Sequence, residues 1–132
     1  MGRQDYHWRH EAILYGWKPG ASHLWYGGRK QDTVWEIDRP SRSPDHPTMK
    51  PIALVVKAIL NSTKGQDVVL DSFLGSGTTL IAAEQTGRFC YGLEIDPIYC
   101  DVIVKRCYQD FPEITIKLNG NPVDPELLFK KT

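Results

Sequence analysis

The sequence predicts an α/β fold with a largely parallel sheet, and two apolar runs with the segment between them lead to this prediction. Val68-Val69-Leu70 is a continuous apolar run, as expected of a strand buried on both faces, and residues 90–95 form a second one. The segment from about Ser76 to Thr86 has the pattern of a helix, with Gly87 as its cap. A helix that joins two apolar strands is typical of a parallel sheet with crossover connections.

A further helix is predicted on each side of these strands. Before them, four apolar residues recur at helical spacing: Val55, Val56, Ile59 and Leu60. Pro51 suits the first turn of that helix, and Gly65 is placed to cap it. After the strands, Asp96-Pro97 has the pattern of an N-cap followed by proline at the first helical position, which predicts a helix to about Gln109. Residues 114–118 predict a third strand.

The amino-terminal third differs in composition from the rest and contains all four tryptophans. Residues 13–17 and 33–37 predict two short strands, and residues 39–45 are the best candidate for a linker. We therefore expect residues 1–45 to be an aromatic and basic segment that could belong to a target-recognition region. Residues 46–132 are expected to hold the α/β unit.

Basic residues of that segment are candidates for DNA contact. Arg29 and Lys30 follow a Gly-Gly pair in a loop, and Arg42 lies in the candidate linker. Such cations bind phosphates, and neighbouring aromatic rings can stack on bases. The alternative is that the tryptophans belong to a core. The overall charge does not distinguish between these alternatives, because 16 basic and 16 acidic residues give a net charge of zero.

Cysteine usage and hydropathy exclude other classes of protein. The 3 cysteines form no CxxC pair, which fits a reducing cytoplasm better than a disulfide framework or a zinc site. Cys100 and Cys107 lie seven apart on a predicted helix, so we expect both on one buried face. No apolar run approaches the length of a membrane span. We therefore expect a cytoplasmic protein without membrane contact and without a metal site.

A glycine-rich loop follows the first predicted strand, where open α/β sheets bind ligands. Gly75 and Gly77 let the backbone approach a ligand, and the helix start at Ser76–Thr78 offers N–H groups to an anion. A nucleoside triphosphate would require a lysine after Gly77, and a dinucleotide would require a glycine where Leu80 stands. Asp71, at the strand end, would repel the phosphates of either ligand. S-adenosylmethionine instead has an ammonium group for Asp71, a carboxylate for the helix start and no phosphate.

A second carboxylate, Glu94, lies at the end of the next strand, 23 residues after Asp71. A carboxylate in this position can accept hydrogen bonds from both ribose hydroxyls of an adenosine. Asp96 is close by, but capping the next helix is its simpler role. The alternative is that the glycine-rich loop is only a structural turn. The combination of the two acids with Gly75 and Gly77 favours cofactor binding over this alternative.

Three segments resemble the final motifs of bacterial and phage DNA amino-methyltransferases: His46–Pro51, Asp71–Thr79 and Gly92–Tyr99. The resemblance is to the permuted group in which an HPTxKP motif precedes the cofactor loop. It covers residues 46–107 closely and residues 7–37 more loosely. It implies a Rossmann-like, S-adenosylmethionine-dependent methyltransferase fold, of which the carboxyl-terminal part of this chain would be the cofactor-binding half.

The residue pattern and the resemblance together assign nine residues to the cofactor pocket: Thr48, Lys50, Asp71, Phe73, Gly75, Ser76, Gly77, Thr78 and Glu94. In the family, HPTxKP forms a pocket wall beside the methionine end, so Thr48 and Lys50 would line that wall. The family usually has Asp-Pro-Phe in the loop, so Phe73 matches and Ser72 departs from the pattern. Loss of that proline would loosen the loop.

The catalytic motif of the family, Asp/Asn/Ser-Pro-Pro-Tyr/Trp, has no counterpart here, because the sequence contains no Pro-Pro dipeptide. In the family this motif holds the target base outside the stack by its exocyclic amine. The resemblance therefore implies an incomplete fold without the amino-terminal catalytic strands, and we assign no catalytic residue. We expect the parent enzyme to act on double-stranded DNA, with adenine N6 favoured over cytosine N4, and the chain alone to be inactive.

A half-sheet of this kind leaves an unpaired edge and uncovered apolar surface. We therefore expect self-association or a complementary catalytic fragment. The alternative function is non-catalytic: a cofactor-binding remnant or a partner subunit. An in-frame Pro-Pro-Tyr/Trp segment just upstream in the coding DNA would decide most of this question.

Overall fold

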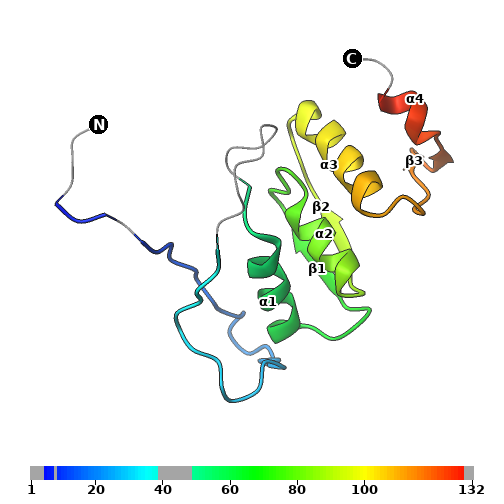
Figure 1. The fold of residues 1–132 in the computed structure, drawn as a ribbon. Helices are drawn as coiled ribbons and strands as arrows, with labels where there is room; N and C mark the ends of the chain where they lie inside the picture. Colours follow the sequence, from blue (N-terminus) through cyan, green and yellow to red (C-terminus); the bar gives the residue numbers. More distant parts are fainter. Residues whose placement is uncertain (1–4, 8, 39–48, 130–132) are drawn as a thin grey trace.

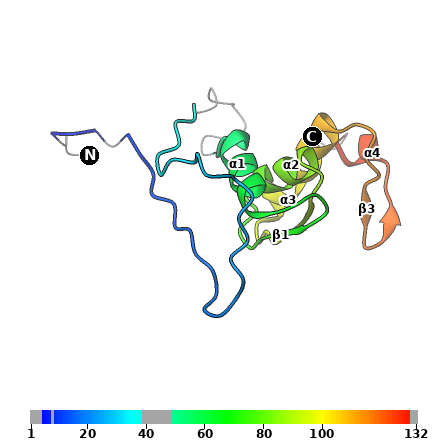
Figure 2. The ribbon, with the colours of Figure 1, turned by 90° about the horizontal axis from the view of Figure 1, so that it is seen from below.

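The computed structural model describes residues 5–7, 9–38 and 49–129, and it confirms the predicted helix–strand–helix–strand–helix order between residues 52 and 110 (Figure 1). The α/β unit consists, in chain order, of helix α1 (Ile52–Ser62), strand β1 (Val68–Asp71), helix α2 (Thr78–Gln85), strand β2 (Phe89–Gly92) and helix α3 (Pro97–Asp110). A hairpin of β3 (Lys117–Leu118) and β4 (Asn121–Pro122) follows, and then helix α4 (Pro125–Phe129). The described residues before α1 form neither helix nor strand and extend away from the α/β unit (Figure 2).

Strands β1 and β2 are parallel, and α2 is their crossover helix, as predicted. The register pairs Val68 with Phe89 and Asp71 with Gly92, so the carboxyl ends of both strands meet at one edge of the sheet. Ligands of open α/β sheets bind at such an edge. The topology therefore brings the residues that follow Asp71 and Gly92 together, although they are far apart in sequence.

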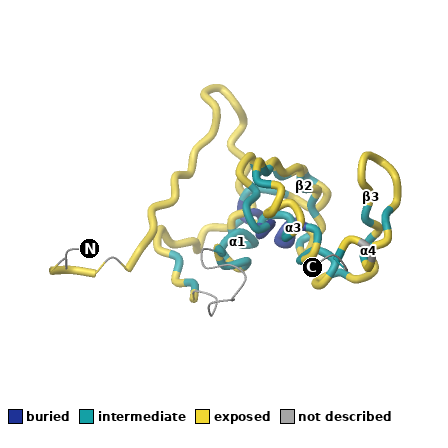
Figure 3. The backbone as a smooth tube through the Cα atoms, turned by 90° about the horizontal axis from the view of Figure 1, so that it is seen from above, coloured by how far each residue is buried: buried dark blue, intermediate teal, exposed yellow. Residues whose placement is uncertain are grey.

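Helices α1 and α2 cover one face of this sheet and form the core with it. Ile59 of α1 and Ala82 and Ala83 of α2 are buried there, and Val69 and Cys90 of the strands pack against them. The buried residues lie in the middle of the α/β unit (Figure 3). Burial of these apolar side chains is the main stabilising contribution to the fold.

The other face of the sheet is uncovered in the part of the chain that the structure describes. Four large side chains of the two strands are exposed on it: Val68 (56%), Leu70 (68%), Phe89 (60%) and Tyr91 (66%). The prediction that both strands are buried on both faces is therefore wrong for the described residues. Successive side chains of a strand point to opposite faces. The apolar run supplies two apolar faces, whereas α1 and α2 cover only one.

The third predicted strand, residues 114–118, is also not observed as expected. Only Lys117–Leu118 is a strand, and it pairs antiparallel with Asn121–Pro122 rather than joining the parallel sheet. Asn119 and Gly120 have φ angles of 51° and 84°, as in a tight Asn-Gly hairpin turn. This turn reverses the chain at once and gives β3 a local partner.

Some helix ends lie where the sequence predicted them, and others do not. Gly87, with a φ of 68°, follows the end of α2, and the side chain of Asp96 caps α3 by accepting from the N–H of Ile98 (2.9 Å). Both are as predicted. Pro51 is the N-cap of α1 rather than part of its first turn. Gly65 does not cap α1: the helix ends earlier, and its C-cap is Thr63, whose backbone is extended (φ −137°, ψ 158°) and whose N–H and hydroxyl both donate to the carbonyl of Ile59 (2.9 and 2.7 Å).

The cysteines of α3 do not share a buried face. Cys100 is exposed, whereas Cys107 is partly buried, and burial raises its pKa to about 11. The prediction of a common buried face is therefore wrong. Residues seven apart lie within about 20° of one face of a helix, so the difference arises along the helix axis: Cys100 stands in the first turn of α3 and Cys107 in its last.

Although much of the irregular segment before α1 extends away from the α/β unit, two of its residues contact that helix, and the strands predicted at 13–17 and 33–37 are not observed. The N–H of Tyr26 donates to the carbonyl of Asn61 at the end of α1 (2.8 Å). Lys57 of α1 lies over the ring of Trp35 at 4.7 Å. Alternating residues form a strand only with a pairing partner, and here helix contacts take that place. The predicted linker lies outside the described residues, and within them no helix is long and apolar enough to span a membrane.

Candidate functional site

The loop between β1 and α2 folds back over the end of β2. The N–H of Leu74 donates to the carbonyl of Leu93, and the N–H of Leu93 donates to the carbonyl of Asp71, each at 2.9 Å. Gly92 permits this approach, because a Cβ there would lie 2.4 Å from a methyl carbon of Leu74. The loop and the residues after both strands therefore form one contiguous site.

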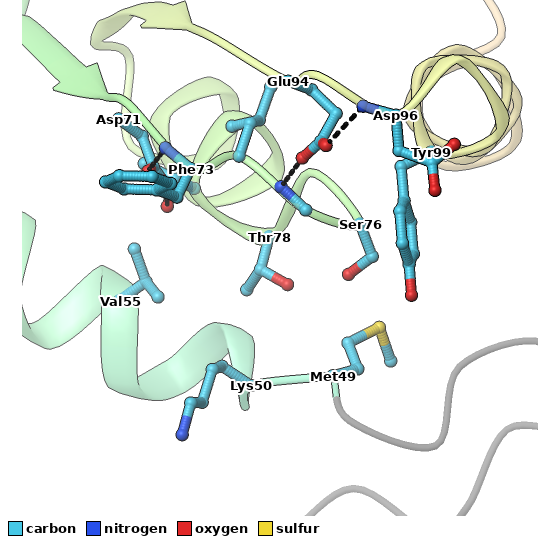
Figure 4. Close-up of a pocket in the computed structure, with 13 residues that line it drawn as sticks. Met49, Lys50, Val55, Asp71, Phe73, Ser76, Thr78, Glu94, Asp96 and Tyr99 are labelled. Atoms are coloured by element: carbon cyan, nitrogen blue, oxygen red, sulfur yellow. Dashed lines mark hydrogen bonds between the residues drawn. The ribbon is translucent and has the colours of Figure 1, made fainter.

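Glu94 links the two sides of this site through its carboxylate. One oxygen accepts from the N–H of Gly75 (2.6 Å), and the other accepts from the N–H groups of Ile95 and Asp96 (2.9 Å each) (Figure 4). These bonds, led by the one from Asp96, hold the pKa of Glu94 below its usual value. The carboxylate is thus ionised at neutral pH and fixed in position.

Asp71 is held in a similar way at the end of β1. Its Oδ1 accepts from the N–H of Phe73 (3.0 Å), and its Oδ2 accepts from the hydroxyl of Thr79 in the first turn of α2 (2.6 Å). Each oxygen keeps a second lone pair for another donor. The acid is therefore oriented without losing its capacity to accept from a ligand.

Gly77 shapes the start of α2 through its backbone. It is the N-cap of the helix with a φ of 82°, in the left-handed region that favours glycine. A Cβ at this position would also lie 3.1 Å from the side chain of Ile103 in α3. Gly77 therefore allows both the turn into α2 and the close approach of α3.

A cavity of about 450 Å³ lies between the loop and the start of α1 (Figure 4). This volume falls in the range of small-molecule sites, about 300–1,000 Å³. The residues that line it are Met49, Lys50, Val55, Asp71, Phe73, Leu74, Gly75, Ser76, Thr78, Thr79, Glu94, Asp96 and Tyr99.

Most of the residues assigned from sequence meet at this cavity. They are Lys50, Asp71, Phe73, Gly75, Ser76, Thr78 and Glu94. Gly77 supports the loop from behind as described above, and Thr48 lies outside the described residues. The role of these residues in cofactor binding stays a prediction.

The lysine of this set does not face the acids. Lys50 forms an ion pair with Glu11, and both side chains are 58% exposed. Its ammonium group points away from Glu94 in Figure 4. Exposed pairs of this kind contribute little to stability. Lys50 therefore contributes mainly its aliphatic part to the wall.

Sequence reasoning missed several cavity residues. Val55 reaches the site only because α1 packs beside α2, and no local pattern indicates this contact. Met49 stands within the HPTxKP segment, whose resemblance to a pocket wall was the signal that could have found it. Tyr99 stands in the first turn of α3, within a segment that carries the family resemblance, and this position was the signal that could have found it. Asp96 lines the cavity as well as capping α3.

Two of the candidate DNA contacts, Arg29 and Lys30, are exposed in the irregular segment and do not line the cavity. Arg42 lies outside the described residues. Nearby rings form a cluster in which Trp17 stacks on His23 (centroids 4.2 Å apart) and Tyr15 meets both edge-on at 5.8 Å. Tyr15 (55%) and Trp17 (56%) are exposed, so in the described structure these rings do not belong to a core, and their contact with DNA stays a prediction.

Acids at the ends of two parallel strands, with a glycine-rich loop at a helix start, define a Rossmann-like α/β domain. Within the described ranges, no group of three or more His, Cys, Asp or Glu residues could hold a metal ion. The sequence model of the DNA methylase family matches residues 5–105, and the chain belongs to that family. This match runs through the irregular amino-terminal segment as well as the α/β unit.

Curated relatives are much longer than this chain. It is similar to the type II methyltransferase M.Cfr9I of Citrobacter freundii, with 36% identity over 97 residues, which is 73% of this chain and 32% of that protein. It is 45% identical to the type II methyltransferase M.HinfI of Haemophilus influenzae over 83 residues, which is 63% of this chain and 21% of that protein. The chain thus spans about a third or less of the length of these relatives.

A solved structure supports the fold directly. The M1.HpyAVI–SAM complex is 33% identical and superimposes with a TM-score of 0.53, over 62% of this chain and 43% of that chain. The predicted Rossmann-like methyltransferase fold is therefore confirmed, in the fragmentary form expected from the sequence.

Proposed function

We propose that this chain is the S-adenosylmethionine-binding part of a cytoplasmic DNA methyltransferase that methylates a base amine. The observation that carries the proposal is the pair of oriented acids, Asp71 and Glu94, on either side of a glycine-rich loop that lines a cavity. Membership of the DNA methylase family supplies the reaction class. A relative of the same fold crystallised with S-adenosylmethionine supports the choice of cofactor.

The cofactor's groups match the site in chemical type. Asp71 accepts from its ammonium group, and the start of α2 at Thr78 faces its carboxylate. Glu94 would accept from the ribose. Its Oε1 already accepts from two N–H groups and its Oε2 from Gly75, so one lone pair is left, for one ribose hydroxyl rather than the two expected from the sequence. Ser76 and Thr78 add polar groups between these two ends.

Binding of the cofactor is not sufficient for methyl transfer. Methyl transfer also needs a base held out of the duplex and an amine aligned with the sulfur–methyl bond. The printed sequence has no Pro-Pro-aromatic motif for this task. We therefore propose that the chain binds the cofactor and requires a complementary catalytic fragment, with adenine N6 favoured over cytosine N4 as the acceptor.

A non-catalytic role is the second candidate, and the same missing motif favours it. In that case the chain is a cofactor-binding remnant or a partner subunit. The exposed apolar sheet face of Val68, Leu70, Phe89 and Tyr91 supports a partner or self-association in either case. Arg29 and Lys30, with Arg42, are proposed to contact the phosphates of double-stranded DNA.

Equilibrium dialysis with S-adenosylmethionine tritiated on the methyl group tests both parts of the proposal. We expect the folded chain to retain label, and no label to enter mixed-sequence DNA. Addition of a fragment that carries the amino-terminal motif should start incorporation if the chain is half of an enzyme, and it should not if the role is non-catalytic. Absence of retained label at saturating cofactor would refute the cofactor assignment, and incorporation by the chain alone would refute its inactivity.

A further inference from the structure

Helix α3 holds the glycine-rich loop through a contact that no sequence motif indicated. The guanidinium of Arg106 donates from Nη1 to the carbonyl oxygen of Ser76 and to the Ser76 hydroxyl, the latter at 3.1 Å. Arg106 is partly buried and is not among the residues that line the cavity. It therefore acts on the site from behind the loop.

The peptide between Ser76 and Gly77 is fixed at both of its polar groups. Its carbonyl accepts from Arg106, and its N–H donates to the carbonyl of Leu74 (2.9 Å). Rotation of this peptide would break both bonds. Hydrogen bonds with a charged donor are roughly twice as strong as neutral ones. The bond from Arg106 therefore contributes more to the fixed orientation of this peptide than the bond to Leu74 does.

Arg106 and Ile103 act on the same part of the loop. They are three residues apart, so they lie on one face of α3. Ile103 is 7% exposed and packs against Gly77, and Arg106 bonds to Ser76. One apolar and one charged contact thus set the position of the peptide from which α2 starts.

This peptide joins a residue of the cavity wall to the N-cap of α2. Ser76 and Thr78 both line the cavity. A rotation of the Ser76–Gly77 peptide would redirect the Ser76 carbonyl and the Gly77 N–H, and it would displace the backbone from which the N–H groups of α2 start. A negative ligand group at the helix start depends on the direction of those N–H groups.

We propose that Arg106 is a positioning residue for the cofactor loop: it sets S-adenosylmethionine affinity through Ser76 without touching the cofactor. The proposal rests on the function proposed above. It differs from a purely structural role, in which loss of Arg106 would weaken the fold and the binding to the same extent.

The test compares variants of the full chain by calorimetric titration with S-adenosylmethionine and by urea denaturation. Arg106→Met keeps the aliphatic stem and removes the donor, and we expect it to weaken affinity about tenfold. Arg106→Lys keeps a charged donor and should restore part of the affinity. Lys105→Met removes a charge from an exposed neighbour on the same helix and should leave affinity unchanged.

Coupling between the two residues provides the decisive measurement. Ser76→Ala removes the hydroxyl bond and keeps the carbonyl bond, so its effect should be smaller than that of Arg106→Met. The double variant should lose less affinity than the two single losses combined. Hydrogen exchange of the Gly77 amide should become faster in Arg106→Met while amides of the α1 core keep their protection.

The possible failures are distinguishable. If the unaltered chain does not bind S-adenosylmethionine, the proposed function is wrong and this inference falls with it. If the chain binds and Arg106→Met binds equally well, only this inference is overturned. It is also overturned if affinity falls only in proportion to the unfolding free energy, with no rescue by lysine. If Arg106→Met does not fold, Arg106→Lys and Arg106→Gln carry the test, because Ser76 itself lines the cavity, and wild-type affinity in both would overturn the proposal.

Discussion

The carboxylate of Glu94 accepts a hydrogen bond from the backbone N–H of Gly75 at 2.6 Å, so an acid at the end of β2 fixes the loop that follows β1. These two residues follow strands that are adjacent in the sheet and separated by a whole helix in sequence. The same acid is the proposed ribose acceptor. Loop geometry and cofactor recognition therefore depend on one side chain.

Loss of either acid should weaken cofactor binding more than folding. Glu94→Gln and Asp71→Asn keep the size of each side chain and remove its charge. We expect each to reduce S-adenosylmethionine affinity by about five- to a hundredfold, because a buried ligand group loses a charged hydrogen-bond partner. Calorimetric titration of each variant measures this loss.

Asp96→Ala is the matched control for these acids. It removes the cap of α3, so we expect a loss of about 1 kcal/mol in unfolding free energy with affinity largely retained. If instead this variant abolishes binding and leaves the unfolding free energy unchanged, Asp96 and not Glu94 is the ribose acid.

The contribution of Glu94 to stability should disappear at acidic pH. Its folded pKa lies below its usual value, which in an unfolded chain is about 4.3. A depressed pKa of this kind stabilises the fold above the unfolded pKa, and this contribution is lost as the pH falls through the folded pKa. The difference in unfolding free energy between wild type and Glu94→Gln should be constant from neutral pH to about pH 5 and shrink below about pH 4. Urea denaturation across this range checks it, and a difference that grows toward low pH would contradict it.

The proposed phosphate contacts should show in the salt dependence of DNA binding. Replacing Arg29 and Lys30 by glutamine should weaken binding equally for different sequences and reduce the slope of log affinity against log salt by about 2. Fluorescence anisotropy with labelled duplexes measures the slope. Lys105→Gln changes one exposed charge elsewhere and serves as the control. An unchanged slope in the double variant would show that these cations do not contact DNA.

The uncovered sheet face should drive association of the chain. Sedimentation velocity at micromolar concentrations should show species larger than a monomer. Leu70→Gln with Tyr91→Gln, both on exposed positions of the face, should shift the population to monomer. Leu118→Gln alters an equally exposed residue of the hairpin, 61% exposed, and should not. A wild-type chain that remains monomeric throughout would refute this expectation.

Local patterns predicted the parallel β–α–β unit because its signals are local. The apolar run of β1, the Asp-Pro start of α3 and the glycine after α2 each specify an element within a few residues. The ends of β1 and β2 then had to meet, because parallel strands joined by a crossover helix present the same ends at one edge. This is why Asp71 and Glu94 could be assigned to one site before the fold was known.

The features that the sequence did not predict depend on contacts between elements. The apolar run of β1 does not reveal that only one face is covered, and residues 114–118 do not reveal that Asn119-Gly120 will pair them locally. Val55 joins the site through the packing of α1. Arg106 reaches Ser76 from α3, thirty residues along the chain. Such contacts are determined by tertiary packing, which overrides local preference.

The most direct test of the cofactor assignment is an NMR titration of the ¹⁵N-labelled chain with S-adenosylmethionine, followed through its backbone amide signals. The account predicts saturable shifts for Gly75, Ser76, Gly77 and Thr78 and for the residues beside Glu94. Amides of the hairpin β3–β4 should remain unchanged. A folded chain whose loop signals do not move at saturating cofactor, or whose shifts lie elsewhere, would contradict the assignment.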